Sequence, residues 1–500
     1  MIWQNWLLIM ILLSSLVPGL IIFTLAESNR AWRTTLNLLG ATMKMVLVLV
    51  MIIGISQGHS FAAHLSLLPG LELVLRADPL SALFVALSTL LWLFTTIYAV
   101  AYLEDAPNRS HFFGYFSICV SVTIGIALAG NLLTFLFFFE MLTLTTYPLV
   151  IHRGTAEAMA AGRLYLLYSL SGGLLLFVGV VWLHVLAGQI DFSRPGLLVP
   201  LLVQHRQSLI LIFFLLMAGV GVKAALVPLH GWLPRAMVAP APVSALLHAV
   251  AVVKAGAFGI MRIVLDVYGL PLSRELGLLM PLTLAATLTI IYGSLLAIRQ
   301  DNLKRRLAYS TVSQVSYIAL GISIGNPLAI MGGMVHLVHQ GIMKITLFFC
   351  AGNIAETLGL HNISRMNGVG RRLPLTMAAF TLAAMGMIGL PPMAGFVSKW
   401  YLGLGAIEQP GHGWLLVVLV LSSLLNAAYF LPIIYGAWFR KQEEAWPEDS
   451  GRKGNWECHW MLVVPPLITA VVSLLVGLLA NSNLSPLAWV RFIVSTRYGP

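Results

Sequence analysis

Five lysines lie within stretches of sequence that are otherwise apolar, where an unpaired charge is costly. They are Lys44, Lys223, Lys254, Lys344 and Lys399. None of the five is an arginine, which keeps its proton in any protein, whereas a buried lysine can lower its pKa and exchange its proton. Among the acids, only Glu140 lies deep in such a stretch, TFLFFFE at residues 134–140. Lysines with a glutamate in this setting are typical of a proton relay, whereas a voltage sensor would need arginine.

Some of these side chains also have a structural interpretation. Lys44 has no polar neighbour in the sequence, and a lysine near the end of a membrane span can extend its ammonium group to the lipid headgroups. Lys344 could serve helix packing alone. For Glu140 we expect an ion pair with one of the lysines, because a charge at mid-membrane costs about 3 kcal/mol or more unless it is paired or hydrated.

Histidines accompany two of the lysines. His336, His339 and Gln340 precede Lys344 in one apolar stretch, and at 100° per residue the four side chains fall within about 140° of arc on one helix face. His248 lies shortly before Lys254. Imidazole titrates near neutral pH and both gives and takes a proton, so we expect these histidines to extend the relay. The alternatives are satisfied core histidines or a metal site, and no carboxylate joins them to favour the latter.

The composition places these residues in a membrane. Of 500 residues, 9% are charged and 59% are hydrophobic, against about 25% charged in soluble domains. This excludes a soluble enzyme, a nucleic-acid binder and a disordered chain, although the net charge is +11. Cys119, Cys350 and Cys458 form no CxxC pair, and no phosphate-binding loop follows a strand, so we expect no cofactor or metal in this chain.

Apolar stretches of about 20 residues predict about fourteen transmembrane helices. The expected spans are 5–25, 33–56, 79–102, 111–129, 131–151, 163–187, 207–230, 241–265, 279–298, 307–325, 327–355, 375–402, 413–439 and 459–481. Seventeen of the remaining cations fall in loops on one side, including Arg452, Lys453 and Arg440, and seven, including Arg262, fall on the other. The side with more cations is expected to face the cytoplasm, which places both termini on the outer side.

Two spans contain prolines that predict a broken helix. Pro228 and Pro234 follow Lys223, and Pro391 and Pro392 precede Lys399. Proline removes a backbone donor, and paired broken helices in matching halves of a transporter point to its ion site. We therefore expect an all-α integral membrane protein, residues 1–500 forming one domain. Helices 1–3 (1–102) precede two inverted five-helix repeats, 111–265 and 279–439, and a last helix, 459–481. Two unrelated proline kinks are the alternative.

Several longer motifs resemble one family, over most of the chain. They are DPLS at 78–81, KAALVPLHGWLP at 223–234, APAPVSALLH at 239–248, DNLKRRLAYSTVSQ at 301–314 and GLPPMAGFVSK at 389–399. They are similar to the antiporter-like membrane subunits shared by respiratory complex I (NADH:quinone oxidoreductase), the membrane-bound hydrogenases and the Mrp cation/proton antiporters. With Val238 included, the motif at 238–248 is most similar to the Mrp D-type subunits and their hydrogenase relatives.

The resemblance implies a role for each buried side chain. Glu140 would pair with Lys223, Lys254 with His248 would be the central relay, and His336, His339 and Lys344 would continue the polar axis to Lys399. Moving the Glu140–Lys223 pair apart or together would change the cost of protonating Lys254 by Coulomb coupling.

The resemblance also implies partners and a location. We expect a proton- or cation/proton-translocating subunit, most similar to the Mrp D-type, in a multisubunit complex of the bacterial inner membrane, with other antiporter-like subunits, lipid, protons and Na⁺ as its partners. The alternative host is a complex I-like oxidoreductase or a membrane-bound hydrogenase. A structural module that has lost transport, or an enzyme acting alone, is disfavoured because the lysines and Glu140 are intact and no nucleophile–base pair is present.

Overall fold

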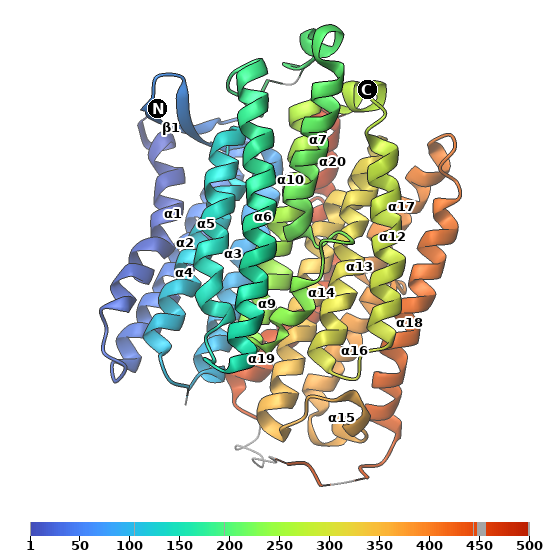
Figure 1. Ribbon diagram of the computed structural model, residues 1–500. Helices are drawn as coiled ribbons and strands as arrows, with labels where there is room; N and C mark the ends of the chain where they lie inside the picture. The colour runs from blue at the N-terminus through green and yellow to red at the C-terminus, as the bar shows by residue number, and fades with distance from the viewer. Residues whose placement is uncertain (1, 105, 195, 444, 448–456, 499–500) are drawn as a thin grey trace.

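The chain forms a bundle of long helices that run roughly parallel to one another (Figure 1). A computed structural model describes residues 2–498 except 105, 195, 444 and 448–456. Among these, 13 helices are long and apolar enough to cross a membrane. Both ends of the chain lie at the same end of the bundle, at the top of Figure 1. The expected all-helical membrane fold is therefore confirmed, and Arg452 and Lys453 lie outside the described residues.

The first three spans carry a small hairpin between the second and the third. They are α1 (Ile2–Phe23), α2 (Arg30–Ser56) and α3 (Pro79–Tyr102), with β1 (Phe61–Leu68) and β2 (Leu71–Ala77) paired antiparallel. Asp78 caps α3 by accepting a hydrogen bond from Ser81 N at 2.7 Å. The apolar pattern of the sequence does not predict this hairpin, because it is too short to cross a membrane.

Two groups of five spans follow. The first contains α4 (Arg109–Ala127), α5 (Leu132–Val150), α6 (Ala156–Ala187), η1 (Val199–Leu201) with α7 (Leu202–Ala224), and the run α8 (Trp232–Arg235), η2 (Ala236–Val238), α9 (Ala241–Ala245), η3 (Leu246–Val250), α10 (Val252–Met261), η4 (Arg262–Tyr268) and α11 (Leu270–Glu275). The second contains α12 (Leu279–Ile298), α13 (Leu303–Ile324), α14 (Pro327–Leu358), η5 (Ile363–Arg365), α15 (Val369–Arg372), α16 (Pro374–Ile388), α17 (Ala394–Glu408) and α18 (Leu415–Phe439). Then come α19 (Trp460–Leu478) and α20 (Pro486–Arg497).

The breaks in the two groups differ in form. In the first, α7 ends at Ala224 and the chain continues without helix until Trp232, so the seventh span stops before Pro228 and not at 230 as expected. In the second, the expected span 375–402 divides into α16 and α17, separated by Gly389–Met393. Lys223 precedes its break and Lys399 follows its own. The inverted relation between the groups stays a prediction.

Two spans make up the centre of the bundle. In the span 241–268 and in α14, every residue of the most apolar 18-residue stretch is buried inside the protein. The first of these spans is irregular, because two π-helical segments flank α10. Such π segments in membrane helices free backbone groups and frequently mark functional positions. Both central spans carry residues of the predicted relay.

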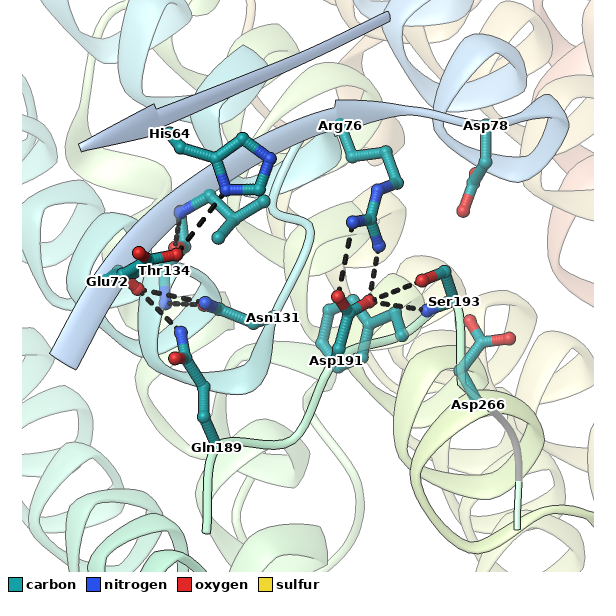
Figure 2. A network of polar contacts seen from close by, with 12 residues as sticks. His64, Glu72, Arg76, Asp78, Asn131, Thr134, Gln189, Asp191, Ser193 and Asp266 are labelled. Atoms are coloured by element: carbon teal, nitrogen blue, oxygen red, sulfur yellow. Dashed lines mark hydrogen bonds and ion pairs between the residues drawn. The ribbon is translucent and has the colours of Figure 1, made fainter. Parts of the chain in front are cut away.

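Polar contacts join the hairpin to the loop after α6 (Figure 2). Arg76 of β2 forms a two-pronged ion pair with Asp191, whose carboxylate also accepts from Ser193 N and Oγ at 2.8 Å each. Asn131 and Gln189 both donate to the carbonyl of Glu72 at 2.9 Å. The hairpin is thus fixed to the first five-helix group by side chains and by main-chain hydrogen bonds such as Gly130 N to the carbonyl of Val74, and it buries Phe61 in the apolar core.

A buried cluster of charges lies beside this loop. Arg262 is 1% exposed and donates to both oxygens of Asp78, at 2.8 and 3.0 Å, and to Asp266 at 2.6 Å. On α20, Arg497 donates to Asp78, and the following Tyr498 donates to Asp266 at 2.8 Å. We call these five residues the Asp78 cluster. The expected place of Arg262 in an outer loop is wrong, because the π-helical end of the span encloses it.

Lys44 is also buried and does not reach the headgroups. Its side chain is 0% exposed, donates to Ser15 Oγ of α1 and lies 5.1 Å from the centroid of the Trp92 ring of α3. The interpretation of Lys44 as a snorkelling lysine is therefore wrong. Its contacts lie among α1, α2 and α3, away from the two central spans.

Candidate functional site

The break after α7 fixes Lys223 at the end of a helix. Ala225 adopts a left-handed conformation (φ 57°) that ends α7, and the carbonyl of Val222 accepts from Ala225 N at 3.1 Å and from the indole of Trp232 at 2.8 Å. Lys223 is 0% exposed. Its ammonium group donates to the carbonyl of Phe139 on α5 and lies 3.6 Å from the centroid of the Phe139 ring, a favourable position for a cation.

Glu140, the next residue after Phe139, lies beside Lys223 without pairing with it. No ion pair joins the two among the described residues, and Glu140 Oε1 has no hydrogen-bond partner there. The half-buried carboxylate packs instead against Gly173 of α6, where any side chain would collide with it. The expected Glu140–Lys223 contact is thus not made in this conformation, since the ring and carbonyl of Phe139 hold the lysine.

Lys254 lies at the centre of the bundle, on α10. It is 0% exposed and donates to the carbonyl of Leu337 at 2.8 Å and to the side-chain oxygen of Gln340, both on α14. Gly256, two residues on, allows α10 to touch the end of α7, because an added Cβ would lie 2.6 Å from the carbonyl carbon of Lys223. The two lysines are therefore held on directly packed helices.

The three histidines of the predicted relay are fully buried. His248 packs on Phe348 with ring centroids 4.6 Å apart, and neither of its ring nitrogens has a hydrogen-bond partner among the described residues. His339 has no such partner either. His336 is hydrogen-bonded through Nδ1 to Ser398 Oγ of α17 at 2.8 Å. These rings offer donors and acceptors that the fold does not use for itself.

Lys344 and Lys399 each bind a backbone carbonyl and a serine. Lys344 donates to the carbonyl of Leu307 at 3.1 Å and to Ser310 Oγ at 2.8 Å, both on α13. Lys399 donates to the carbonyls of Met387 and Ile388 at 3.2 and 2.8 Å and to Ser423 Oγ at 3.0 Å. Met387 and Ile388 end α16, so the broken helix supplies free carbonyls for a cation, as a helix C-terminus favours.

Hydrogen bonds connect Lys344 to Lys399 through residues that were not expected from the sequence. Ser310 Oγ is bonded to the hydroxyl of Tyr429 at 2.8 Å, and Tyr429 donates to Asn426 at 2.6 Å. Asn426 donates at 3.1 Å to the Met387 carbonyl that also accepts from Lys399. We call this the Tyr429 link. Asn426 and Tyr429 lie one turn apart in an apolar span, which was a signal in the sequence.

The four lysines of the predicted relay, Lys223, Lys254, Lys344 and Lys399, are held in the same way. Each donates to a main-chain carbonyl of a different helix, and within the described part of the chain none forms an ion pair with a carboxylate. Nor do three His, Cys, Asp or Glu side chains converge there to hold a metal ion. Because no carboxylate pairs with these ammonium groups, a proton on one of them raises the cost of protonating a neighbouring one.

Comparisons with known proteins agree on one family. A family described as NADH:quinone oxidoreductase/Mrp antiporter, TM, matches residues 129–426. The chain is 35% identical over 430 residues to the N-type subunit of the NADH-quinone oxidoreductase of Desulforudis audaxviator, covering 83% of each chain. It is 27% identical over 411 residues to the D-type subunit of the Na(+)/H(+) antiporter of Bacillus subtilis, covering 81% of this chain and 80% of that one.

Length and fold add two findings. The chain spans only 42% of the A/B-type subunit of a probable K(+)/H(+) antiporter of Rhizobium meliloti, to which it is 29% identical over 86% of its own length. A chain in the structure of the Mrp complex from Dietzia sp. DQ12-45-1b has the same fold. It superimposes with a TM-score of 0.84 at 23% identity, covering 99% of this chain and 98% of that one.

Proposed function

The chain belongs to the NADH:quinone oxidoreductase/Mrp antiporter transmembrane family, and from that premise we propose that it moves protons across the membrane as one part of a larger complex. The observation that carries the proposal is the set of four lysines on α7, α10, α14 and α17, each held by a carbonyl of another helix. The first three are fully buried and Lys399 is partly buried. The relay residues are those expected from the sequence: Glu140, Lys223, Lys254, His248, His336, His339, Lys344 and Lys399.

The mechanism rests on repulsion between neighbouring ammonium groups. When the proposed Glu140–Lys223 pair forms, the carboxylate offsets the charge of Lys223 and makes protonation of Lys254 less costly. In the conformation described above, Lys223 is turned to Phe139 and makes no direct ion pair with Glu140, so we propose that the carboxylate offsets its charge less than it would in a formed pair. Alternation between these arrangements would load and unload Lys254.

Two hosts are open to this chain, and each has a supporting observation. The motif at 239–248 favours a D-like role in an Mrp-type cation/proton antiporter. The 35% identity to the N-type oxidoreductase relative, against 27% to the D-type antiporter relative, favours a redox-driven complex. In either host we propose the bacterial inner membrane, with both termini on the periplasmic side and further antiporter-like subunits beside this one.

The experiment that separates the hosts is purification of the native complex from membranes with a tag on this chain. Subunits with iron–sulfur clusters or flavin in the purified complex, with proton uptake into proteoliposomes driven by an electron donor, would identify a redox complex. Membrane subunits alone, with proton exchange driven by a Na⁺ or K⁺ gradient, would identify an antiporter. If the reconstituted complex moved no protons under either condition, the proposed function would be overturned.

The Tyr429 link provides a test of the relay itself. Tyr429→Phe removes the hydroxyl that joins Ser310 to Asn426, so Ser310 holds Lys344 less firmly. A hydrogen bond is worth about 1 kcal/mol, so we expect a loss of about fivefold in the proton flux of the reconstituted complex. Tyr435→Phe, an exposed position on the same helix, is the control. Equal flux from both variants would contradict a role for the link.

A further inference from the structure

Two hollows of different character meet on one flank of the bundle. The first, of about 250 Å³, lies where α2, α4 and α19 begin and α3 ends, at the end of the bundle away from the termini. The second, of about 210 Å³, continues along α2, α3 and α19. They share Val100, Trp460 and Met461 as lining residues. The two hollows therefore lie next to each other along this flank, and we call them together the α2–α19 groove.

The first hollow is positively charged. Arg30, Arg33 and Arg109 line it, against one described acid, Glu104. The first turns of three helices also lie there, and helix N-termini carry partial positive charge. Arg33 is only 3% exposed and donates to Ser110 Oγ at 3.0 Å, so its guanidinium group is held in place.

Glu27 offsets this charge only in part. Its carboxylate accepts hydrogen bonds from the main-chain nitrogens of Arg109 and Ser110, at 3.0 and 2.9 Å, and lies 3.6 Å from Arg109 Nε. Burial alone would raise the pKa of Glu27, but these amide donors and Arg33 lower it. Arg109 Nε still has no hydrogen-bond partner among the described residues. Since Arg109 Nε is buried beside Glu27, the groups that can meet a further anion in the hollow are the exposed Arg30 and the partly exposed guanidinium group of Arg109.

The second hollow has no polar lining. Its remaining walls are Leu38, Phe94, Ile97, Val464, Pro465 and Ile468, and Ile468 is 39% exposed on the flank of the bundle. Trp460, 46% exposed, stands at the junction of the two hollows. An indole at the boundary between charged and apolar surface is typical of the headgroup level of a membrane.

We propose that the α2–α19 groove binds one anionic phospholipid, with its phosphate at Arg30 and Arg109 and an acyl chain along Ile97 and Val464. A free phosphate would use only the charged hollow, and an apolar helix of a partner would leave the arginines without an anion. A lipid satisfies both halves at once. This site shares no residue with the relay, so the inference stands apart from the proposed function.

Native mass spectrometry of the purified complex tests the site. The complex is titrated in detergent with phosphatidylglycerol, with phosphatidylcholine of the same acyl chains, and with inorganic phosphate. We expect one phosphatidylglycerol per copy of this chain to be retained above the phosphatidylcholine level. The double variant Arg30→Gln, Arg109→Gln should weaken its retention by about tenfold or more, since two charge-assisted contacts are lost.

Two further variants make the outcome decisive. Val464→Trp fills the apolar hollow without changing charge and should also release the lipid. Arg371→Gln, an exposed arginine of α15 outside the groove, should not. Three results would overturn the proposal: equal retention of both lipids, displacement of phosphatidylglycerol by inorganic phosphate with no effect of Val464→Trp, or a copurifying protein segment seated in the groove instead of lipid.

Discussion

Replacing Lys254 by methionine should abolish proton translocation and leave the protein folded. Methionine matches the unbranched shape of lysine and suits the apolar surroundings, so packing is kept. The variant removes the one titratable group that contacts both Leu337 and Gln340 at the centre of the bundle. Loss of a proton-transfer group costs about 100-fold or more. Proton flux into proteoliposomes and thermal unfolding in detergent would measure the two effects.

Two further variants show what the loss means. Lys254→Arg keeps the charge but binds its proton permanently, so it should be as inactive as Lys254→Met if the proton itself must leave the side chain. Lys44→Met removes an equally buried lysine that lies outside the predicted relay, and it should keep most of the proton flux. Full activity in Lys254→Arg, or equal loss in Lys44→Met, would refute the assignment.

The largest loss of stability is expected from Arg262→Met. The substitution leaves the carboxylates of Asp78 and Asp266 buried without their shared guanidinium group, which costs about 3–5 kcal/mol. It also weakens the attachment of α20, because Arg497 and Tyr498 bind the same two carboxylates. Thermal unfolding at neutral pH should show the change. Arg491→Met, on the exposed face of α20, is the control and should be nearly neutral.

The pH dependence of that variant gives a second readout. Burial alone would raise the pKa of Asp78, but Arg262 and Arg497 hold it well below the usual value. The stability that ionised Asp78 gives to the wild-type protein is therefore complete above about pH 4 and is lost only as the pH falls further. Without Arg262 the pKa of Asp78 should rise. The difference in free energy of unfolding between the wild type and the variant should therefore become smaller at acid pH. If the difference in free energy of unfolding between the wild type and Arg262→Met stayed constant from pH 7 to pH 4, this explanation would be wrong.

Much of the fold was predictable because a bilayer imposes simple rules on length and polarity. The spans at 79–102 and 279–298 match α3 and α12 at both ends. The hairpin at 61–77 was not predicted, since its strands are short and gain their position from polar contacts at Glu72 and Asp191 and from main-chain hydrogen bonds to the turn between α4 and α5. The burial of Arg262 was missed for a similar reason: Asp266 lies only four residues on, but Asp78, its other partner, comes from a distant part of the chain.

The candidate site was predictable as a set of residues but not as a set of contacts. Lysines in apolar runs are visible in a sequence because they are rare there. Their partners are not visible, because main-chain carbonyls carry no sequence signal. The family resemblance implied Glu140 as the partner of Lys223, whereas the structure places the carbonyl and ring of Phe139 there. Tyr429 and Asn426 also gained their meaning only once α18 was packed against α13 and α16.

The Tyr429 link has a consequence for how Lys344 and Lys399 affect each other. It runs through the amide of Asn426 and the peptide carbonyl of Met387, groups that neither release nor take up protons near neutral pH. The link therefore carries no protons. Its hydrogen bonds hold α13, α16 and α18 in fixed positions relative to one another. A displacement of α18 would weaken the hydrogen bonds that hold Lys344 and those that hold Lys399 at the same time. The two lysines would therefore respond to a single movement of this helix.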